Sequence, residues 1–300
     1  MVKKLKEQFG FIAIIGPTNA GKSTLINSIM GRKVAIVSHK VQTTRTRLRA
    51  VKMMGAAQLV FVDTPGIFRP ARRLDKAMVS SAYSAFNESD ATLLVIDAMH
   101  GITENVRAII ERIKTKQNIF AALNKVDAVK KENLLPMAAE LMALAPFGEI
   151  FMISALKGKG TEEMLNALAA VMPAGRHMFD DKDASDVPDN LFLAEMTREK
   201  VYRYLHQELP YQIHVKTDKA EYDHENVLEI YQTILVAKES QKRIVVGAKG
   251  AKLQQIGTAA RHEIQDEWGV NARLKLFVKV DENWQNDAEN YESQGLEFKK

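Results

Sequence analysis

Cysteine is absent from this sequence of 300 residues, and no long uncharged run occurs in it. The lack of cysteine excludes disulfide frameworks, thiol catalysis, iron–sulfur clusters and zinc sites with cysteine ligands. The histidines are scattered without a pair at ligand spacing, so a histidine-bound metal centre is not expected. The longest stretch without Asp, Glu, Lys or Arg, residues 8–21, is too short to cross a bilayer and contains Gly and Pro. We therefore expect a soluble globular protein.

The N-terminal residues imitate a secretory signal, because three lysines within residues 3–6 precede the apolar run 9–15. This run is shorter than most signal cores and leads directly into a glycine-rich turn. No small-residue cleavage site follows it. A buried parallel strand explains the run better.

Short apolar runs alternate with amphipathic segments through the first 170 residues. The runs cover 11–15, 59–62, 91–96, 118–123 and 149–153, and the helical patterns lie near 22–30, 71–88, 104–115, 131–145 and 161–171. Apolar strands that alternate with helices predict an α/β domain whose mostly parallel sheet is covered on both faces. Ligands of such sheets bind beyond the carboxyl ends of the strands.

The pattern changes after an acidic, aperiodic stretch near residues 174–190, which predicts a linker. Helices are then expected near 191–207, 239–246 and 251–267, and strands near 211–217, 227–237 and 272–280. Their order, α-β-β-α-α-β, predicts a small α+β domain. The predicted domains are 1–175, a linker 176–190, 191–285 and an acidic C-terminal tail 286–300 that is expected to fray.

Residues 16–23, Gly-Pro-Thr-Asn-Ala-Gly-Lys-Ser, match the phosphate-binding loop G-x-x-x-x-G-K-S/T between a predicted strand and a predicted helix. The glycines let backbone N–H groups point at phosphate oxygens at the helix N-terminus. Lys22 is predicted to reach the β- and γ-phosphates, and the Ser23 hydroxyl to bind Mg²⁺. The residues predicted to contact the phosphates are Gly16, Pro17, Thr18, Asn19, Ala20, Gly21, Lys22, Ser23 and Thr24.

A second motif closes the apolar run 59–62 and reads Asp63, Thr64, Pro65, Gly66. An acid at this point holds Mg²⁺ through water, and the glycine frees a backbone N–H to sense a γ-phosphate. The tetrapeptide alone is weak evidence, because Asp, Pro and Gly are common in turns. Its position after a phosphate loop makes it indicative of a nucleotide site.

A third motif, Asn-Lys-Val-Asp at residues 124–127, predicts selection of guanine. The Asp127 carboxylate can accept two parallel hydrogen bonds from N1–H and the 2-amino group of guanine, whereas adenine offers neither donor. Asn124 is expected to brace the base-binding loop, and Lys125 to pack its stem along the ring. A backbone N–H for the guanine oxygen is expected from the end of the following strand, at Ser154, Ala155 and Leu156.

These motifs, in this order, make the first domain resemble a translation-factor-type GTPase domain. The resemblance implies a further element, a loop threonine that binds Mg²⁺ in the GTP state. Thr44 is the first candidate within residues 42–47, and Thr43 is the second. The catalytic set implied by the resemblance is Lys22, Thr44, Asp63 and Gly66.

Ile67 is a departure from Ras-like enzymes, which place a water-orienting glutamine after this aspartate motif. The chain is similar here to the GTPase subgroup with a hydrophobic residue at that position. In that subgroup an asparagine at the position of Asn19 can ligate K⁺, whose charge would assist catalysis. The alternative is that Asn19 is a turn residue that tolerates an unusual backbone angle. Turnover is expected to be slow without an activating partner.

Residues 247–250, Gly-Ala-Lys-Gly, form a G-x-x-G loop between two predicted helices. The glycines allow close approach of a nucleic-acid backbone, and Lys249 adds positive charge. With the order of the elements, this resembles a type II KH domain, which clamps about four single-stranded nucleotides. A plain helix–turn–helix link with glycine caps is the alternative. The predicted RNA-binding residues are Lys242, Arg243, Gly247, Ala248, Lys249, Gly250 and Lys252.

A GTPase domain followed by a type II KH domain resembles the Era family of bacterial GTPases, within the TrmE-Era-EngA-like superfamily. Residues 42–45, 198–200, 208–211 and 246–253 support the resemblance, which covers residues 5–285. It implies binding of 16S rRNA near its 3′ end during assembly of the 30S ribosomal subunit, with GTP favouring the RNA-binding arrangement. It also implies a cytoplasmic monomer that associates peripherally with the inner membrane, for which no amphipathic, Lys-rich segment gives independent support.

Three alternatives stay open at this point. A GTPase of the same superfamily would act on another structured RNA, such as tRNA. A P-loop ATPase or kinase would leave Asp127 unexplained, and a structural RNA-binding module with a dead nucleotide site would leave Lys22, Ser23 and Asp63 unexplained.

The charge is small overall but unevenly distributed. Lys and Arg number 42 against 37 Asp and Glu, a net charge of +5. Residues 1–175 hold 24 basic and 14 acidic residues, whereas residues 191–300 hold 16 and 18. The stretch 31–62 has seven basic residues and no acid. This distribution predicts that both domains face RNA.

Overall fold

The computed structural model describes residues 6–38, 48–68, 70, 73–180, 185–205 and 209–292. The chain divides into two compact units. Of the described residues, 6–35 and 48–186 belong to the first unit, and 36–38 and 187–292 to the second. No helix within the described ranges is long and apolar enough to span a membrane.

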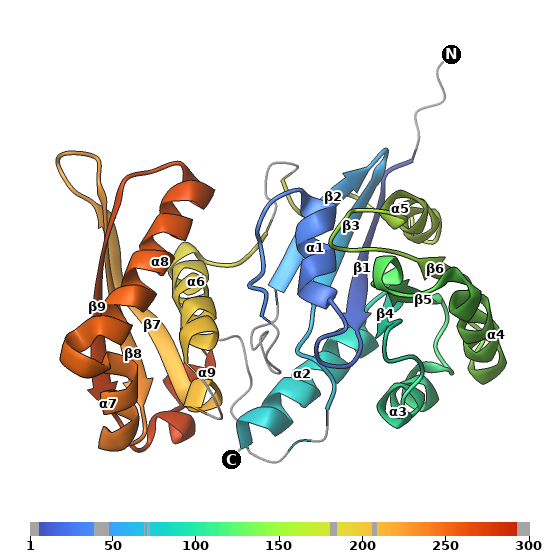
Figure 1. The fold of residues 1–300 in the computed structure, drawn as a ribbon. Helices are drawn as coiled ribbons and strands as arrows, with labels where there is room; N and C mark the ends of the chain where they lie inside the picture. The colour runs from blue at the N-terminus through green and yellow to red at the C-terminus, as the bar shows by residue number, and fades with distance from the viewer. Residues whose placement is uncertain are drawn as a thin grey trace. The chain divides into compact units, whose positions relative to one another are not determined.

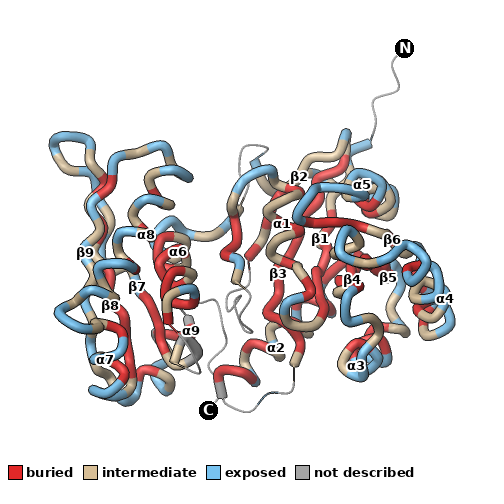
Figure 2. Tube along the Cα trace, in the orientation of Figure 1, coloured by how far each residue is buried: buried red, intermediate tan, exposed pale blue. Residues whose placement is uncertain are grey.

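The first unit is built on a six-stranded sheet with the order β2-β3-β1-β4-β5-β6 (Figure 1). Its strands are β1 (Gln8–Ile15), β2 (Leu48–Met54), β3 (Ala57–Asp63), β4 (Ala91–Asp97), β5 (Ile119–Asn124) and β6 (Ile150–Met152). All neighbouring strands are parallel except β2 and β3. Figure 2 shows these strands as largely buried, which agrees with their apolar sequences.

Helices cover both faces of this sheet. They are α1 (Lys22–Met30), α2 (Arg73–Glu88), α3 (Glu104–Ile113), α4 (Leu134–Leu144) and α5 (Thr161–Ala170). Residues of α2, α3 and α4 share one apolar cluster with alternate strand residues such as Ala13 and Leu94. The intervening residues Ile12 and Ile14 are also fully buried, and α1 and α5 contact β2 and β3.

Strand β2 does not appear among the expected strands, because basic and apolar residues are mixed along it. It pairs antiparallel with β3, from Leu48 opposite Asp63 to Met54 opposite Ala57. Gly55 lies in the connecting turn with a φ of +61°, a conformation that glycine adopts without strain. The hairpin places β2 at the edge of the sheet, where one face does not need to be apolar.

The stretch predicted to be a linker is bonded to the first unit. Gln58 accepts hydrogen bonds from the backbone N–H groups of Met178 and Phe179, with N–O distances of 2.9 and 3.0 Å. The backbone N–H of Asp186 donates to the carbonyl of Arg49, and their side chains form an ion pair. Polarity alone indicated a loop, but these polar groups find partners on β2 and β3.

The second unit has the predicted order α-β-β-α-α-β. Its elements are α6 (Asp189–Tyr204), β7 (Ile213–Tyr222), β8 (Leu228–Val236), α7 (Glu239–Val246), α8 (Ala251–Trp268) and β9 (Ala272–Val280). The sheet has the order β7-β8-β9, with β7 and β8 antiparallel and β8 and β9 parallel. Apolar residues of α6, α7, α8 and the three strands form its core.

The acidic C-terminal segment is folded in part, contrary to the expectation of a tail from residue 286. Helix α9 spans Ala288–Glu292, and Trp284 and Tyr291 are almost completely buried. The Trp284 ring stacks on His214 with the ring centroids 5.8 Å apart. The composition of this segment is polar, but burial of the Trp284 and Tyr291 side chains stabilises its folded part.

Candidate nucleotide and RNA sites

The predicted phosphate loop lies between the end of β1 and the start of α1, beyond the carboxyl end of a central strand. The loop carries Gly16, Pro17, Thr18, Asn19 and Ala20, and Thr24 follows in the first turn of α1. A side chain at Gly21 would collide with the Asn124 amide, and its φ of +96° is also one that glycine favours. The second glycine is therefore required by a close approach between this loop and the 124–127 loop.

Lys22 is buried and bonded to its own loop. Its Nζ lies 3.1 Å from the carbonyl oxygen of Gly16 and 2.9 Å from that of Pro17. Desolvation by burial lowers the pKa of Lys22 to about 8, although the Asp63 carboxylate acts to raise the pKa. A phosphate brought to this ammonium would supply the counter-charge that the loop carbonyls replace only in part.

Ser23 and Asp63 meet at the end of β3. The Ser23 hydroxyl donates to Oδ2 of Asp63 across 3.0 Å, and Asp63 is fully buried. The Thr64 hydroxyl donates to the carbonyl of Ile14, which joins the end of β3 to β1. The structure thus brings the phosphate-loop serine and the aspartate motif together, as a shared cation site requires.

Ile67 belongs to the core rather than to the site surface. Its side chain is 5% exposed and lies in the apolar cluster under α2 and α3. Its backbone N–H donates to the carbonyl of Gly16, and its carbonyl accepts from the Asn105 side chain. Through this N–H, the backbone of Ile67 joins the aspartate motif to the phosphate loop. Its buried side chain has no polar group that could orient a water molecule.

Asn124 connects three loops from a buried position. Its Nδ2 donates to the carbonyl of Ala20 across 2.8 Å. Its Oδ1 accepts from the backbone N–H of Lys125 at 2.8 Å and from that of Ala155 at 2.9 Å. One side chain therefore holds the phosphate loop, the 124–127 loop and the 154–156 loop together, as a pre-organised ligand site requires.

Lys125 adopts a left-handed backbone with a φ of +66° and points its ammonium at two acceptors. Its Nζ lies 2.9 Å from the carbonyl oxygen of Asn19 and 2.7 Å from Oδ2 of Asp97. Burial acts to raise the pKa of Asp97, but hydrogen bonds from Lys125, the Met99 N–H and His100 outweigh it and hold that pKa below its usual value.

Asp127 is ionised and lies next to the 154–156 loop. Hydrogen bonds from Ser154 and then Lys157 lower the pKa of its carboxyl group. The Lys157 Nζ lies 3.2 Å from Oδ2 of Asp127. The Ala155 N–H is bonded to Asn124, and Leu156 is 81% exposed. The carboxylate is in the charged form that accepts two donors from one base edge.

Asn19 has a φ of +63°. This left-handed conformation is the one that the turn-residue interpretation of Asn19 requires, because asparagine tolerates it better than most residues. The other predicted residues are placed at the same edge of the sheet: Pro65 and Gly66 follow Asp63, and Gly66 lies against Thr18. Thr43 and Thr44 lie outside the described residues.

The G-x-x-G loop forms a tight turn between α7 and α8. Gly247 has a φ of +73° and a ψ of 179°, which side chains other than hydrogen rarely allow. A Cβ at Gly247 would lie 2.6 Å from Cβ of Lys252. Lys249 is exposed with a left-handed φ of +49°, and Ala248 is exposed beside it. The turn therefore presents Lys249 to solvent on a backbone that requires glycine at position 247.

A groove of about 490 Å³ begins at this loop and runs between α8 and β9. Its lining consists of Gly250, Leu253, Gln254, Gly257, Thr258, Arg261, Arg273, Leu274 and Leu276. Of the predicted RNA-binding residues only Gly250 lines this groove; Lys242, Arg243, Gly247, Ala248, Lys249 and Lys252 do not, and the other lining residues were not predicted. The spacing of 250, 253, 254, 257, 258 and 261 is helical and could have indicated one face of α8, but the β9 residues come from a distant segment.

Comparison with known proteins identifies both units. The family model described as a 50S ribosome-binding GTPase matches residues 11–125, and the KH domain model matches residues 208–285. GTPase Era of Mesorhizobium japonicum is 49% identical over 290 residues, which cover 96% of this chain and 94% of that protein. The chain belongs to the Era family of GTPases. GTPase Era of Brucella suis is 48% identical over a similar length.

Solved Era structures match 96% of this chain. A crystal structure of Era in complex with MgGDPNP and nucleotides 1506–1542 of 16S ribosomal RNA matches with a TM-score of 0.91 and 35% identity. It covers 96% of this chain and 99% of that one. A variant of Aquifex aeolicus Era bound to GDP and AlF4⁻ matches with a TM-score of 0.90. These matches confirm the predicted family, the architecture of a P-loop GTPase domain with a KH domain, and the GTPase activity.

Proposed function

We propose that this Era-family GTPase is a GTP-controlled switch that binds 16S rRNA near its 3′ end during assembly of the 30S subunit. One observation carries the proposal: a phosphate loop and a guanine-type base loop, joined through Asn124, occur in one chain with a G-x-x-G groove. The rRNA is supported by the solved Era complex that contains nucleotides 1506–1542.

Guanine selection depends on Asp127. Its carboxylate is ionised, and the neighbouring 154–156 loop is held by Asn124. Two donors on adjacent atoms of guanine would satisfy the two carboxylate oxygens, whereas adenine would leave them unpaired. Asn124, Lys125, Ser154, Ala155 and Leu156 complete the proposed base site.

The residues present fit a magnesium ion. Ser23 and Asp63 place hydroxyl and carboxylate oxygens 3.0 Å apart at the phosphate loop, and hard oxygen donors are the ligands that Mg²⁺ prefers. Ser23 would bind the ion directly, Asp63 would hold its water ligands, and Thr44 would complete the set. When bound, Mg²⁺ neutralises the charge of the β- and γ-phosphates. GTP, GDP and Mg²⁺ are ligands that the solved Era structures support.

A potassium ion near Asn19 is a finer proposal. The asparagine lies on the phosphate loop with its backbone carbonyl bonded to Lys125, and a carbonyl oxygen or side-chain oxygen can ligate K⁺. The left-handed backbone at Asn19 also explains this residue without K⁺. Comparison of GTP turnover in K⁺ and in Na⁺ distinguishes K⁺ ligation by Asn19 from a purely conformational role of this residue.

Hydrolysis would depend on the chain's own groups as follows. Lys22 binds the terminal phosphates and stabilises the charge that develops on them. The Gly66 N–H senses the γ-phosphate, and Asp63 and Thr44 fix the cation. The buried Ile67 cannot orient the attacking water. We infer that turnover is slow until a partner, ion or RNA-bound state supplies that function.

RNA would enter the groove between α8 and β9, with Gly247, Ala248, Lys249 and Gly250 against its backbone. The basic residues Lys242, Arg243 and Lys252 flank this loop. The proposed setting is the 30S subunit in the cytoplasm, with the protein acting as a monomer. Peripheral contact with the inner membrane remains a prediction of the family resemblance.

The proposal is tested by binding RNA of nucleotides 1506–1542 to the full chain loaded with GDPNP or with GDP. Tighter binding with GDPNP is expected, and Lys249→Gln should weaken RNA binding while GTP binding stays near normal. Equal affinity in both nucleotide states would contradict the switch. Preference for a tRNA or for another rRNA region over this RNA would favour the alternative target.

A further inference from the structure

The chain after α1 is held on both sides of the point where it passes from the first unit to the second. Asn27 of α1 makes hydrogen bonds of 2.8 to 2.9 Å to the backbone of residues 34 and 35. Two positions further on, the backbone N–H of Val37 donates to Oε2 of Glu199 on α6 across 3.1 Å. Residue 35 belongs to the first unit and residues 36–38 to the second. Glu199 therefore attaches residues 36–38 to the first helix of the KH unit.

A second attachment lies at the start of β2, within the first unit. The backbone N–H of Arg49 donates to Oδ1 of Asp186 at 2.9 Å, and the carbonyl of Arg49 accepts the Asp186 N–H at 3.2 Å. The Nη1 atom of Arg49 lies 3.4 Å from Oδ2 of the same carboxylate. Arg49 pairs with Val62, the residue before Asp63 of the predicted cation site. The first unit ends at Asp186 among the described residues, and α6 begins at Asp189. One aspartate thus fixes the start of β2 to the chain that leads into the KH unit.

Residues 39–47 connect the two attachments along the chain and lie outside the described residues. They contain Thr43 and Thr44, the candidates for the Mg²⁺ ligand in the GTP state. A threonine bound to the cation would restrain the chain between Val37 and Arg49. The bonds at both ends would then form with a smaller loss of conformational entropy. We therefore expect both attachments to be stronger with GTP than with GDP.

Glu199 is also joined to the helix that follows the G-x-x-G loop. Its side chain is 14% exposed, and its Oε1 lies 3.1 Å from Nζ of Lys200. The same ammonium lies 2.6 Å from Oε2 of Glu263 on α8 and is almost completely buried. Helix α8 begins directly after Gly250, and one of its faces lines the groove. Because a buried ion pair is costly to break, a change at Glu199 is felt by α8.

We propose that Glu199 and Asp186 are positioning residues that couple the nucleotide state to RNA affinity, because they hold the two ends of the segment that contains Thr43 and Thr44. Coupling between two ligands requires contacts that differ in strength between two states, and these two attachments supply such contacts. The inference rests on the proposed function, since it assumes that GTP favours RNA binding. It adds the side chains through which that preference is transmitted, and both lie outside the recognised motifs.

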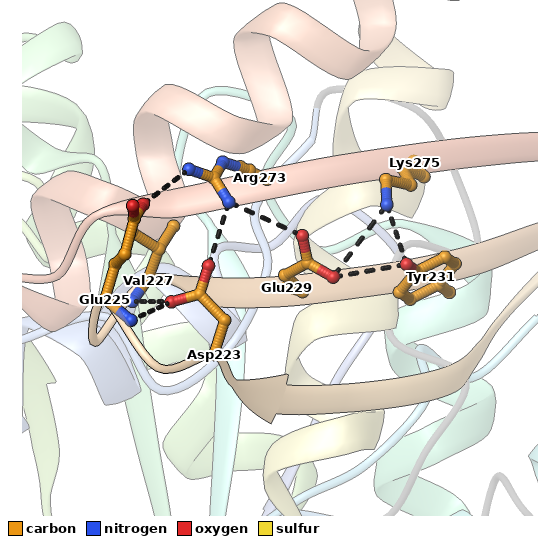
Figure 3. Close-up of polar contacts among 7 residues, drawn as sticks. All are labelled: Asp223, Glu225, Val227, Glu229, Tyr231, Arg273 and Lys275. Carbon is orange, nitrogen blue, oxygen red and sulfur yellow. Dashed lines mark hydrogen bonds and ion pairs between the residues drawn. The ribbon is translucent and has the colours of Figure 1, made fainter.

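A charged cluster elsewhere in the KH unit provides a control. Figure 3 shows the hydrogen bonds and ion pairs that join the hairpin 223–227 to β8 and β9. In this cluster Nη2 of Arg273 lies 3.2 Å from Oε2 of Glu225. The contacts drawn there involve neither α6 nor residues 36–38. Glu225→Ala therefore removes a carboxylate from an ion pair of this unit without touching either attachment, and its effect on RNA affinity should be equal in both nucleotide states.

The test measures the affinity of the full chain for RNA of nucleotides 1506–1542 with GDPNP and with GDP. The ratio of the two affinities is the coupling factor, and by linkage RNA changes the relative affinity for the two nucleotides by the same factor. Glu199→Ala removes the acceptor of the first attachment, and Val37→Pro removes its donor without changing the ion pair with Lys200. The double variant and Asp186→Ala complete the set. Val37→Ala, which keeps the N–H, and Glu225→Ala are the controls, and thermal unfolding verifies that each variant is folded.

The wild type should bind the RNA about fivefold to 150-fold more tightly with GDPNP than with GDP. Glu199→Ala, Val37→Pro and Asp186→Ala should each lower this factor by about twofold to tenfold, mainly through weaker RNA binding with GDPNP. The double variant should lower it no further than Glu199→Ala does, because both changes remove the same bond. Val37→Ala and Glu225→Ala should leave the factor unchanged.

The assignment of each residue can fail separately. An unchanged coupling factor in Glu199→Ala would overturn the role of Glu199, and the same result in Asp186→Ala would overturn that of Asp186. Additive losses in the double variant would show that the bond between Val37 and Glu199 does not transmit the nucleotide state. An equal loss in Glu225→Ala would attribute the effect to general destabilisation of the unit and would overturn both roles. Equal RNA affinity of the wild type in both nucleotide states would instead contradict the proposed function, so the two failures are distinguishable.

Discussion

The ammonium of Lys125 donates to the backbone carbonyl of Asn19, with Nζ 2.9 Å from the oxygen. This bond links the 124–127 loop to the fourth residue of the phosphate loop, and the Asp97 carboxylate holds the same ammonium from β4. One side chain thereby joins the loop predicted to bind the base to the loop predicted to bind the phosphates. We therefore expect Asp97, which lies outside the recognised motifs, to affect nucleotide affinity.

Asp97→Asn is expected to weaken GDP binding by about fivefold to tenfold, because Lys125 loses a charge-assisted hydrogen bond worth about 1–1.5 kcal/mol. Titration with a fluorescent GDP analogue measures the change. His100→Ala is the matched control: His100 bonds the same carboxylate, but its side chain is 73% exposed. An equal loss of affinity in both variants would show that Lys125 is not the group that Asp97 positions.

Asp127→Asn should exchange guanine selectivity for xanthine selectivity. The amide presents a donor where the carboxylate presents an acceptor, so it repels the 2-amino group of guanine and accommodates the 2-oxo group of xanthine. One charge-assisted hydrogen bond is lost, the second loses its charge, and two donors face each other, which together predict a decrease in GTP affinity of about 100-fold or more. Competition between GTP and xanthosine triphosphate measures it, and unchanged GTP selectivity would refute the base-reading role.

Replacement of Na⁺ by K⁺ should raise GTP turnover if Asn19 ligates the larger ion. Asn19→Ala should then abolish the difference between the salts. Phosphate release is measured at constant ionic strength in both salts. Equal rates in the wild type would leave the left-handed backbone at Asn19 as the reason for this residue.

Lys22→Met should stabilise the protein without nucleotide, and the gain should depend on pH. The pKa of Lys22 falls from 10.5 to about 8 on folding, which corresponds to a cost on the order of 3 kcal/mol. Below pH 8 the lysine is charged in both states and the folded state bears the full cost. Between pH 8 and 10.5 the unfolded chain holds a proton that the folded chain has lost, so wild-type stability rises with pH.

The advantage of Lys22→Met should accordingly be largest at pH 7 and shrink as pH rises through this window. Urea unfolding of both proteins at several pH values measures the difference in the free energy of unfolding. A difference that does not change with pH would show that desolvation of the ammonium is not its source.

Gly247→Ala should destabilise the KH unit by about 1–3 kcal/mol, because its backbone angles are almost restricted to glycine and its Cβ would meet Lys252. RNA affinity should fall at least tenfold while GTP turnover in the absence of RNA stays unchanged. Gly269→Ala is the control, since Gly269 has a similar φ of +65° but open space around it. Loss of GTP binding together with RNA binding would contradict two separable sites.

Motif spacing led to residues that the structure brings together at one edge of the sheet, because each motif is local and follows an apolar strand; their roles toward a nucleotide stay predictions. The edge strand β2 escaped prediction, since Lys52 and Arg49 interrupt its apolar pattern and its partner is known only from the register with β3. The roles of Asp97 and Asn105 also depend on contacts across the sheet edge. No sequence window contains both members of such pairs.

The lining of the KH groove was also difficult to predict, because it combines residues that are far apart in the sequence. The G-x-x-G loop is a local signal, and residues of α8 follow helical spacing. Arg273 lies 23 positions beyond Gly250, and only the pairing of β9 with β8 brings it opposite Glu229. The start of the predicted tail, α9, differs from the expectation for a related reason: its residues Asn290 and Tyr291 bond to the carbonyls of Trp284 and Gln285, and the Trp284 ring stacks on His214, seventy positions earlier.

The bonds from Lys22 to the Gly16 and Pro17 carbonyls have a consequence for phosphate binding. These two carbonyl oxygens occupy donors of the Lys22 ammonium. A phosphate that binds Lys22 would have to compete with them, so the bonds are expected to oppose phosphate binding at this ammonium.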